Sequence, residues 1–153
     1  MTIDAVRDND ERNIKGAGAE HAVAAYLMLA HNRLVVDVMS RSNIGFDLAV
    51  YARTTGRFCR LQVKYHSETD GGVQVSPREF DFLVVVARPM ELATNGPDDM
   101  VGASALAWPM WVIPATEVES NGYVAKPWKV ANYHNWKPML EYLGIHQKSK
   151  RRG

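Results

Sequence analysis

The sequence has a single cysteine, Cys59, among its 153 residues. One thiol excludes a framework of internal disulfides and is typical of a protein that works in a reducing compartment. No apolar run approaches the roughly 20 residues that a membrane-spanning helix requires, and no secretory signal is visible at the N-terminus. We therefore expect a cytoplasmic protein without a membrane partner.

The sequence also lacks a strong bias of charge. Its 18 Lys and Arg residues nearly balance 17 Asp and Glu residues, for a net charge of +1, which is not the composition of a protein that coats nucleic acid. Its five histidines share no zinc-ligand spacing. The length and the 46% hydrophobic content predict one globular domain over residues 12–146, with a flexible lead-in at 1–11 and a basic tail at 147–153.

Two short segments read as the strands of one β-hairpin with its turn at residues 55–56. In that register Ala49 lies opposite Gln62, and Asp47 lies opposite Lys64. Because side chains alternate along a strand, these four residues share one face. The other face is apolar and holds Phe46, Leu48, Val50, Leu61, Val63 and Tyr65. The hairpin thus gathers a carboxylate, an amide and an ammonium group on one surface.

That pattern has a simpler interpretation as well. A polar strand face is usually the solvated side of a half-buried sheet, and Asp–Lys pairs across strands are ordinary weak stabilisers. A register shift of one residue would also move Asp47 and Lys64 to opposite faces. The hairpin alone does not decide between a solvated surface and a catalytic site.

A helix is predicted upstream, after Lys15. Its apolar residues follow the i, i+3, i+4, i+7 spacing of a core-facing stripe, and alanine and leucine favour helix. The stripe consists of Val23, Tyr26, Leu27 and Ala30. Glu20 lies in the first turn at the edge of this stripe, where it either complements the positive helix N-terminus or points toward the hairpin.

Further elements follow the hairpin. Ser76, followed by a proline and Glu79, has the pattern of a capped helical turn. Residues 83–87 and 109–115 read as buried strands, and residues 132–143 as a closing helix. Cys59 lies on the apolar face of the hairpin and is most simply a small core residue.

The order of these segments resembles the PD-(D/E)xK nuclease superfamily, and in particular archaeal Holliday-junction resolvases and small intron-encoded endonucleases. The segments that carry the resemblance are Gly16-Ala17-Gly18-Ala19-Glu20, Gly45-Phe46-Asp47-Leu48-Ala49, Leu61-Gln62-Val63-Lys64, Phe80-Asp81-Phe82-Leu83-Val84-Val85-Val86 and Met110-Trp111-Val112-Ile113-Pro114-Ala115. Each motif is short, so the specificity of the resemblance lies in their order and spacing.

The resemblance implies an α/β fold with a restriction-endonuclease-like core, in which helices flank a mixed central sheet in the order αβββαβ. It implies a DNA endonuclease that uses Mg²⁺, for which Mn²⁺ can substitute. Asp47, Gln62 and the carbonyl of Val63 would be metal ligands, Lys64 the catalytic lysine, and Glu20 an auxiliary acid and metal ligand. It further implies a homodimer or higher homo-oligomer, because cutting two strands requires two sites.

The sequence departs from the family pattern at Gln62, where an acid is usual. An amide oxygen can bind a hard cation but brings no negative charge. The alternative is therefore a catalytically silent nuclease-fold protein that binds nucleic acid or a protein partner.

Two sets of residues are candidate phosphate contacts. Ser40, Arg41 and Asn43 lie in the loop before Asp47. The C-terminal tail carries Lys148, Lys150, Arg151 and Arg152. A basic tail of this kind either adds salt-dependent contacts to DNA or is a solvated chain end, and the sequence favours neither.

Overall fold

The protein is described from a computed structural model. The structure describes residues 3–39, 45–76, 79–88 and 108–146, and for residues 3–10 only the backbone. Its helices and strands are α1 (Ile3–Ala30), β1 (Leu34–Val38), β2 (Leu48–Ala52), β3 (Phe58–His66), β4 (Val73–Gln74), β5 (Phe82–Ala87), β6 (Met110–Pro114), β7 (Tyr123–Val124) and α3 (Lys137–Tyr142). Two 3₁₀ turns are η3 (Ala115–Glu117) and η4 (Val130–Asn132).

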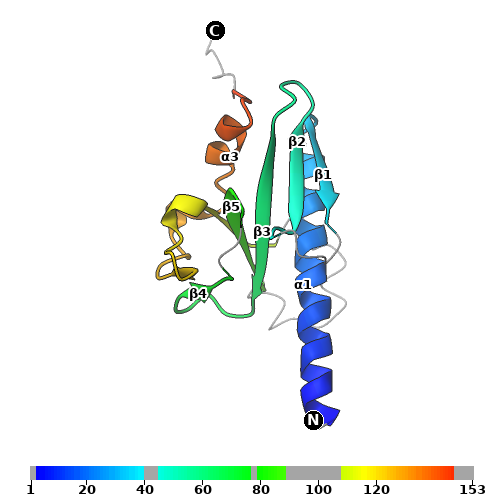
Figure 1. Ribbon diagram of the computed structural model, residues 1–153, viewed down its shortest axis with the longest axis vertical. Coiled ribbons are helices and arrows are strands. Elements are labelled where there is room, and N and C mark those ends of the chain that lie inside the picture. Colours follow the sequence, from blue (N-terminus) through cyan, green and yellow to red (C-terminus); the bar gives the residue numbers. More distant parts are fainter. Residues whose placement is uncertain (1–2, 40–44, 77–78, 89–107, 147–153) are drawn as a thin grey trace.

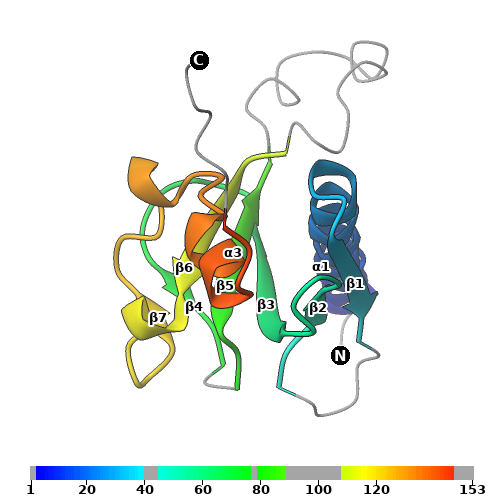
Figure 2. The ribbon, with the colours of Figure 1, turned by 90° about the horizontal axis from the view of Figure 1, so that it is seen from above.

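Five strands form one mixed sheet in the order β1-β2-β3-β5-β6. Neighbouring strands are antiparallel except for β3 and β5, which are parallel. Figure 2 shows β6 and β1 at opposite ends of the row of strands. The predicted α/β class with a mixed central sheet is confirmed.

Each face of the sheet has its own apolar core. On one face, α1 and α3 cover a large cluster that includes Val23, Leu27, Leu61 and Met139. Figure 1 shows α1 running behind β1 and β2. On the other face, the two-stranded β4–β7 sheet and its neighbours cover a smaller cluster around Leu83. This second cluster does not include the β1 and β2 strand residues, so their outer face has no such cover among the described residues.

The β2–β3 hairpin forms, but the register predicted for it is wrong by two residues. Ala49 pairs with Arg60, not with Gln62. The loop is longer than predicted, because Ala52 N–H donates to the Arg57 carbonyl and closes a four-residue turn (2.9 Å). Since the shift is an even number of residues, Gln62 and Lys64 keep the predicted face.

Phe46 departs from its predicted face. It packs against the smaller core cluster, on the opposite side of the sheet from Leu48. Leu48 pairs with Leu61, and Asp47 N–H also donates to the Leu61 carbonyl (2.8 Å). Two consecutive residues therefore face one residue of β3, as in a β-bulge, which changes the alternation of side chains before it.

The helices near the two ends of the chain differ in length from those predicted. Residues 3–11, which fall in the predicted lead-in, are helical and belong to α1. The sequence places opposite charges four residues apart at Asp8 and Arg12, and at Glu11 and Lys15, a spacing that stabilises helix. The N-terminal turns of α1 run beyond the strands (Figure 1).

The closing helix is shorter than predicted. It covers Lys137–Tyr142 and not residues 132–143. Proline is accepted in the first turn of a helix but not in its interior, so Pro138 fixes where α3 starts. The helical turn predicted from Ser76 lies partly outside the described residues, and Ser76, Glu79 and Phe80 are not helical.

Candidate active site

The four residues predicted to be catalytic line one cavity of about 770 Å³. They are Glu20, Asp47, Gln62 and Lys64. The rest of its lining consists of Glu11, Arg12, Lys15 and Gly16 from α1, and Val63, Tyr65, His66 and Ser67 from the end of β3 and after it. The cavity therefore lies where the middle of α1 passes the second half of β3.

Asp47 is held against β3 by two hydrogen bonds. Its backbone N–H donates to the Leu61 carbonyl, and its Oδ2 accepts the N–H of Val63 (2.8 Å each). The backbone pairing of β2 with β3 ends at Leu48. Beyond it, the Asp47 carboxylate accepts the Val63 N–H in place of a backbone carbonyl. The N–H and C=O of one strand residue point to the same side, so the Val63 carbonyl also points toward Asp47.

Gln62 and Lys64 alternate with core residues along β3. Leu61 and Val63 are buried in the larger core, so the two polar side chains face the other side of the sheet. Gln62 is partly buried and Lys64 is exposed. The strand thus supplies an amide oxygen and an exposed cation to the cavity that Asp47 also lines.

The helix supplies the opposite wall. Glu20 is partly buried, one turn before the fully buried Val23. Glu11, Arg12 and Lys15 also line the cavity, and sequence reasoning missed them because the helix was predicted to begin only after Lys15. Their signal was the four-residue spacing of Glu11 with Lys15, and of Arg12 with Gly16 and Glu20, which puts them on one side of a longer helix.

The cavity is mixed in charge. Glu11, Glu20 and Asp47 bring carboxylates, while Arg12, Lys15 and Lys64 bring cationic groups. Such a site can hold a cation and an anion side by side. This is the combination that a metal-assisted reaction on a phosphate requires.

The donor set of the cavity suits a hard cation. Asp47 and Glu20 provide carboxylate oxygens, Gln62 an amide oxygen and Val63 a carbonyl, and oxygen donors are what Mg²⁺ prefers. In the part of the chain that the structure describes, no group of three or more His, Cys, Asp or Glu side chains could hold a metal. The oxygen donors of the lining therefore suit a hard divalent cation that keeps several of its water ligands.

The residues predicted to contact phosphate cannot be placed. Ser40, Arg41 and Asn43, and the tail residues Lys148, Lys150, Arg151 and Arg152, lie outside the described residues. Their contacts to DNA stay predictions.

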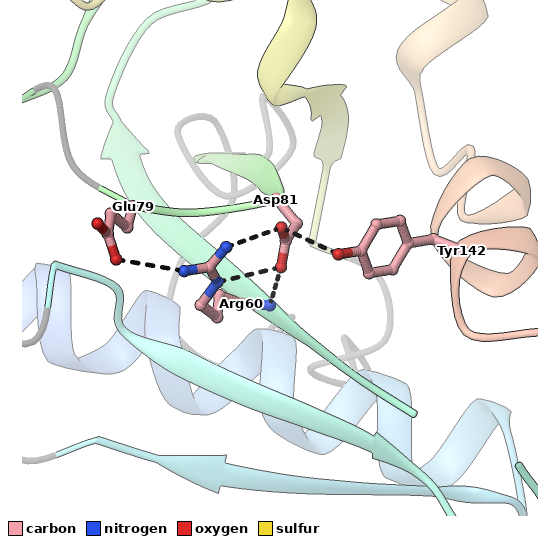
Figure 3. A network of polar contacts seen from close by, with 4 residues as sticks. All are labelled: Arg60, Glu79, Asp81 and Tyr142. Carbon is pink, nitrogen blue, oxygen red and sulfur yellow. Dashed lines mark hydrogen bonds and ion pairs between the residues drawn. The ribbon is translucent and has the colours of Figure 1, made fainter. Parts of the chain in front are cut away.

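A second acidic residue next to β3, Asp81, belongs to a polar network away from the cavity (Figure 3). Its Oδ2 accepts the backbone N–H of Arg60 (2.8 Å), its Oδ1 accepts from the Arg60 guanidinium, and Tyr142 donates its hydroxyl (3.2 Å each). Burial alone would raise the pKa of Asp81, but the hydrogen bonds and charge of Arg60 outweigh it and lower that pKa. This network joins β3, the start of β5 and α3.

A nucleophilic thiol is not part of the site. Cys59 is fully buried, as predicted, and burial together with the charge of Asp81 raises the pKa of its thiol to about 12. The thiolate that a covalent mechanism requires is therefore not formed near neutral pH.

A second cavity of about 750 Å³ adjoins the first and shares Lys15 and Tyr65 with it. Gly18 and Ala22 of α1 line it, and Trp108 lies in its wall. It extends the first cavity along α1.

Comparison with known proteins bears on the fold. Neither the known protein families nor the curated proteins give a match. Among solved structures, a bacterial homing endonuclease, I-Ssp6803I, matches with a TM-score of 0.55 and 17% sequence identity, over 85% of this chain and 92% of that one. The chain shares the fold of that endonuclease. This agrees with the resemblance to intron-encoded endonucleases drawn from the sequence, at the level of architecture.

None of the described helices combines the length and the apolar character needed to cross a bilayer.

Proposed function

We propose that the protein is a divalent-metal-dependent DNA endonuclease that hydrolyses phosphodiester bonds in the cavity between α1 and β3. One observation carries the proposal. Glu20, Asp47, Gln62 and Lys64 come from three separate segments of the sequence and line a single cavity, in a chain that shares the fold of a homing endonuclease. Segments so far apart meet in this way only if the fold brings them together.

Each residue has a task that follows from its chemistry. Lys64, exposed at the cavity wall, orients the attacking water or neutralises the negative charge that develops on the phosphate. Asp47 is fixed by the Val63 N–H and offers oxygen ligands without having to reorganise. Glu20 adds negative charge from the helix side, directly or through water.

Asp47, Gln62, the Val63 carbonyl and Glu20 would hold the Mg²⁺ ion. When bound, the ion polarises the phosphate and lowers the pKa of a bound water. Gln62 contributes an oxygen but no charge, so the neighbouring carboxylates must supply the negative charge that holds the ion. Glu11, Glu20 and Asp47 are the carboxylates of the cavity lining.

DNA is the proposed substrate. Arg12 and Lys15 line the cavity beside Lys64 and can contact phosphates on either side of the scissile bond. The loop residues Ser40, Arg41 and Asn43 and the basic tail would extend these contacts. A homodimer or higher oligomer would supply a second site for the second strand.

A cleavage assay tests the proposal. The protein is incubated with branched, nicked and linear DNA in Mg²⁺, in Mn²⁺, and in an excess of chelator. The account predicts cleavage of at least one substrate with either metal, and none with the chelator.

The alternative function predicts a different result. A catalytically silent protein would retain DNA in a binding assay at low salt and cut none of the three substrates with either metal. Gln62 favours this alternative, because it brings no negative charge to a bound cation. Metal-independent cleavage would contradict both functions.

A further inference from the structure

Strand β1 forms one edge of the sheet, and none of the described residues pairs with its outer side. Its sequence is Leu34-Val35-Val36-Asp37-Val38 and contains no proline or lysine, the residues that usually protect a free edge. Val35 is 40% exposed and Val38 is 38% exposed. An open edge with this composition is suited to pairing with another strand.

The hydrogen bonds of β1 identify which backbone groups face outward. Arg53 N–H donates to the Arg33 carbonyl, and Met39 N–H donates to the Asp47 carbonyl (2.9 Å each). The backbone N–H and C=O groups of the odd-numbered residues therefore point toward β2. By alternation, those of Val36 and Val38 face the open edge. Leu34 adds its carbonyl, since its own N–H donates to the His31 carbonyl.

An exposed apolar row runs inward from this edge. Val35 pairs with Tyr51, and Tyr51 pairs with Phe58, so the three side chains lie side by side on one face of β1, β2 and β3. Tyr51 is 42% exposed, Phe58 is 50% exposed, and their rings stack with centroids 5.6 Å apart. On the same face, Arg33 and Asp37 flank Val35 at a distance of two residues, and both are exposed.

We propose that a second copy of this chain pairs with β1, antiparallel and with Val35 opposite Val35 of the partner subunit. In this register Arg33 lies opposite Asp37 of the partner subunit, twice by symmetry. The outward Val36 N–H of each copy donates to the Leu34 carbonyl of the other. The two apolar rows join into one across the interface.

Self-complementarity selects a second copy as the occupant. A two-fold interface requires a surface to match itself, and the sequence Arg-x-Val-x-Asp does so about its central valine. A register shift of two residues would place Val35 opposite Asp37 and separate both charge pairs. The charges and the apolar row therefore favour the same register.

The pairing itself does not depend on the proposed function, but it has a consequence that rests on that function. Phe58, Gln62 and Lys64 lie at alternate positions on one face of β3. A two-fold axis perpendicular to the sheet keeps that face on the same side in both copies. A ten-stranded sheet would then present two sets of Gln62 and Lys64 to one substrate.

Charge reversal tests the register. The account predicts a dimer by sedimentation of the full chain, weakened about tenfold by Arg33→Asp and likewise by Asp37→Arg, because like charges then face each other. The double variant Arg33→Asp/Asp37→Arg restores the original affinity. A monomer at all concentrations, or a double variant weaker than both single variants, would overturn the proposal.

A disulfide trap provides a second readout that does not depend on affinity. Val35 and its counterpart form a non-hydrogen-bonded pair about 4.5 Å apart at Cα, within reach of a disulfide. Val35→Cys is expected to give a covalent dimer under mild oxidation, since the native Cys59 is fully buried. The matched control is Val130→Cys, at a site that is 91% exposed and lies in η4, which contacts β6 at the opposite edge of the sheet from β1.

Equal cross-linking of the two variants, or none of Val35→Cys, would contradict the interface. Both experiments measure mass and not cleavage. Their outcome therefore stands whether or not the protein cuts DNA.

Discussion

Two aspartates on either side of β3 each accept a backbone N–H from this strand. Asp47 accepts from Val63, and Asp81 accepts from Arg60 (2.8 Å each). Both follow a phenylalanine and precede a strand that starts with an apolar residue. The surroundings separate their roles: Arg60 and Tyr142 engage Asp81, whereas Asp47 lines the cavity.

The network of Asp81 predicts a pH dependence of stability. Because the pKa of Asp81 is lower in the folded chain, its ionised form stabilises the fold above the unfolded pKa of about 3.9, and this stability is lost as the pH falls through the lower folded pKa. Asp81→Asn should cost about 1–3 kcal/mol at pH 7 and much less at pH 2.5. Urea unfolding across this range measures the difference.

Tyr142→Phe is the control for that experiment. It removes one hydrogen bond to Asp81 but leaves Arg60 in place, so a smaller loss of about 0.5–1.5 kcal/mol is expected at pH 7. A loss in Asp81→Asn that is the same at pH 7 and pH 2.5 would mean that the charge of Asp81 does not stabilise the fold.

Gln62 determines how much negative charge the cavity offers a cation. Gln62→Glu adds a carboxylate near Asp47 and should raise the affinity for Mg²⁺ by about tenfold, while Gln62→Ala removes an oxygen donor and should lower it. Isothermal titration calorimetry measures both. If the two variants bind Mg²⁺ equally well, residue 62 is not a ligand.

At the scale of elements, α1 contains glycines that its fold does not require. Added at Gly18, a Cβ would meet nothing within 4 Å, and the same is true at Gly56 in the hairpin turn. Gly18→Ala should therefore stabilise the protein by about 0.5–1 kcal/mol, because alanine favours helix. Gly56 has a φ of +72°, so Gly56→Ala should destabilise it by about 1–2 kcal/mol.

Thermal or urea unfolding of the two variants compares backbone effects alone, since neither new methyl group meets a neighbour. A destabilising Gly18→Ala would indicate that this part of α1 needs the flexibility of glycine.

Local patterns predicted the strands better than their pairing. The strand near 83–87 was evident from an unbroken apolar run, and α1 from its core-facing stripe. The register of β2 against β3 was not evident from the sequence. A four-residue turn and a two-residue turn fit the same alternation of side chains along the two strands. Phe46 was misplaced for a related reason, since a bulge leaves no mark in the alternation of the sequence.

The start of α1 was missed because residues 3–14 have no apolar stripe. Their helical signal is the spacing of charges, which is weaker than burial. Predicting α1 from its full length would have added Glu11, Arg12 and Lys15 to the site.

At the scale of the whole molecule, the sequence predicted which residues of the hairpin and helix would meet, but not the cavity between them. Its walls come from α1 and β3, whose approach depends on how Val23 and Leu27 pack against Leu61 in the core. The outer edge of β1 was also invisible to sequence, because a buried strand and an edge strand share the same apolar composition. Only the order of strands in the sheet distinguishes them.

The most direct test of the central claim is the rate of Mg²⁺-dependent DNA cleavage by Lys64→Ala beside a matched variant, Lys126→Ala. Lys126 is an exposed lysine outside the cavity lining. The account predicts that Lys64→Ala loses at least about a hundredfold in cleavage rate, because it removes the cation at the reacting phosphate, while Lys126→Ala cuts like the unaltered chain. Cleavage that survives Lys64→Ala undiminished would contradict the account.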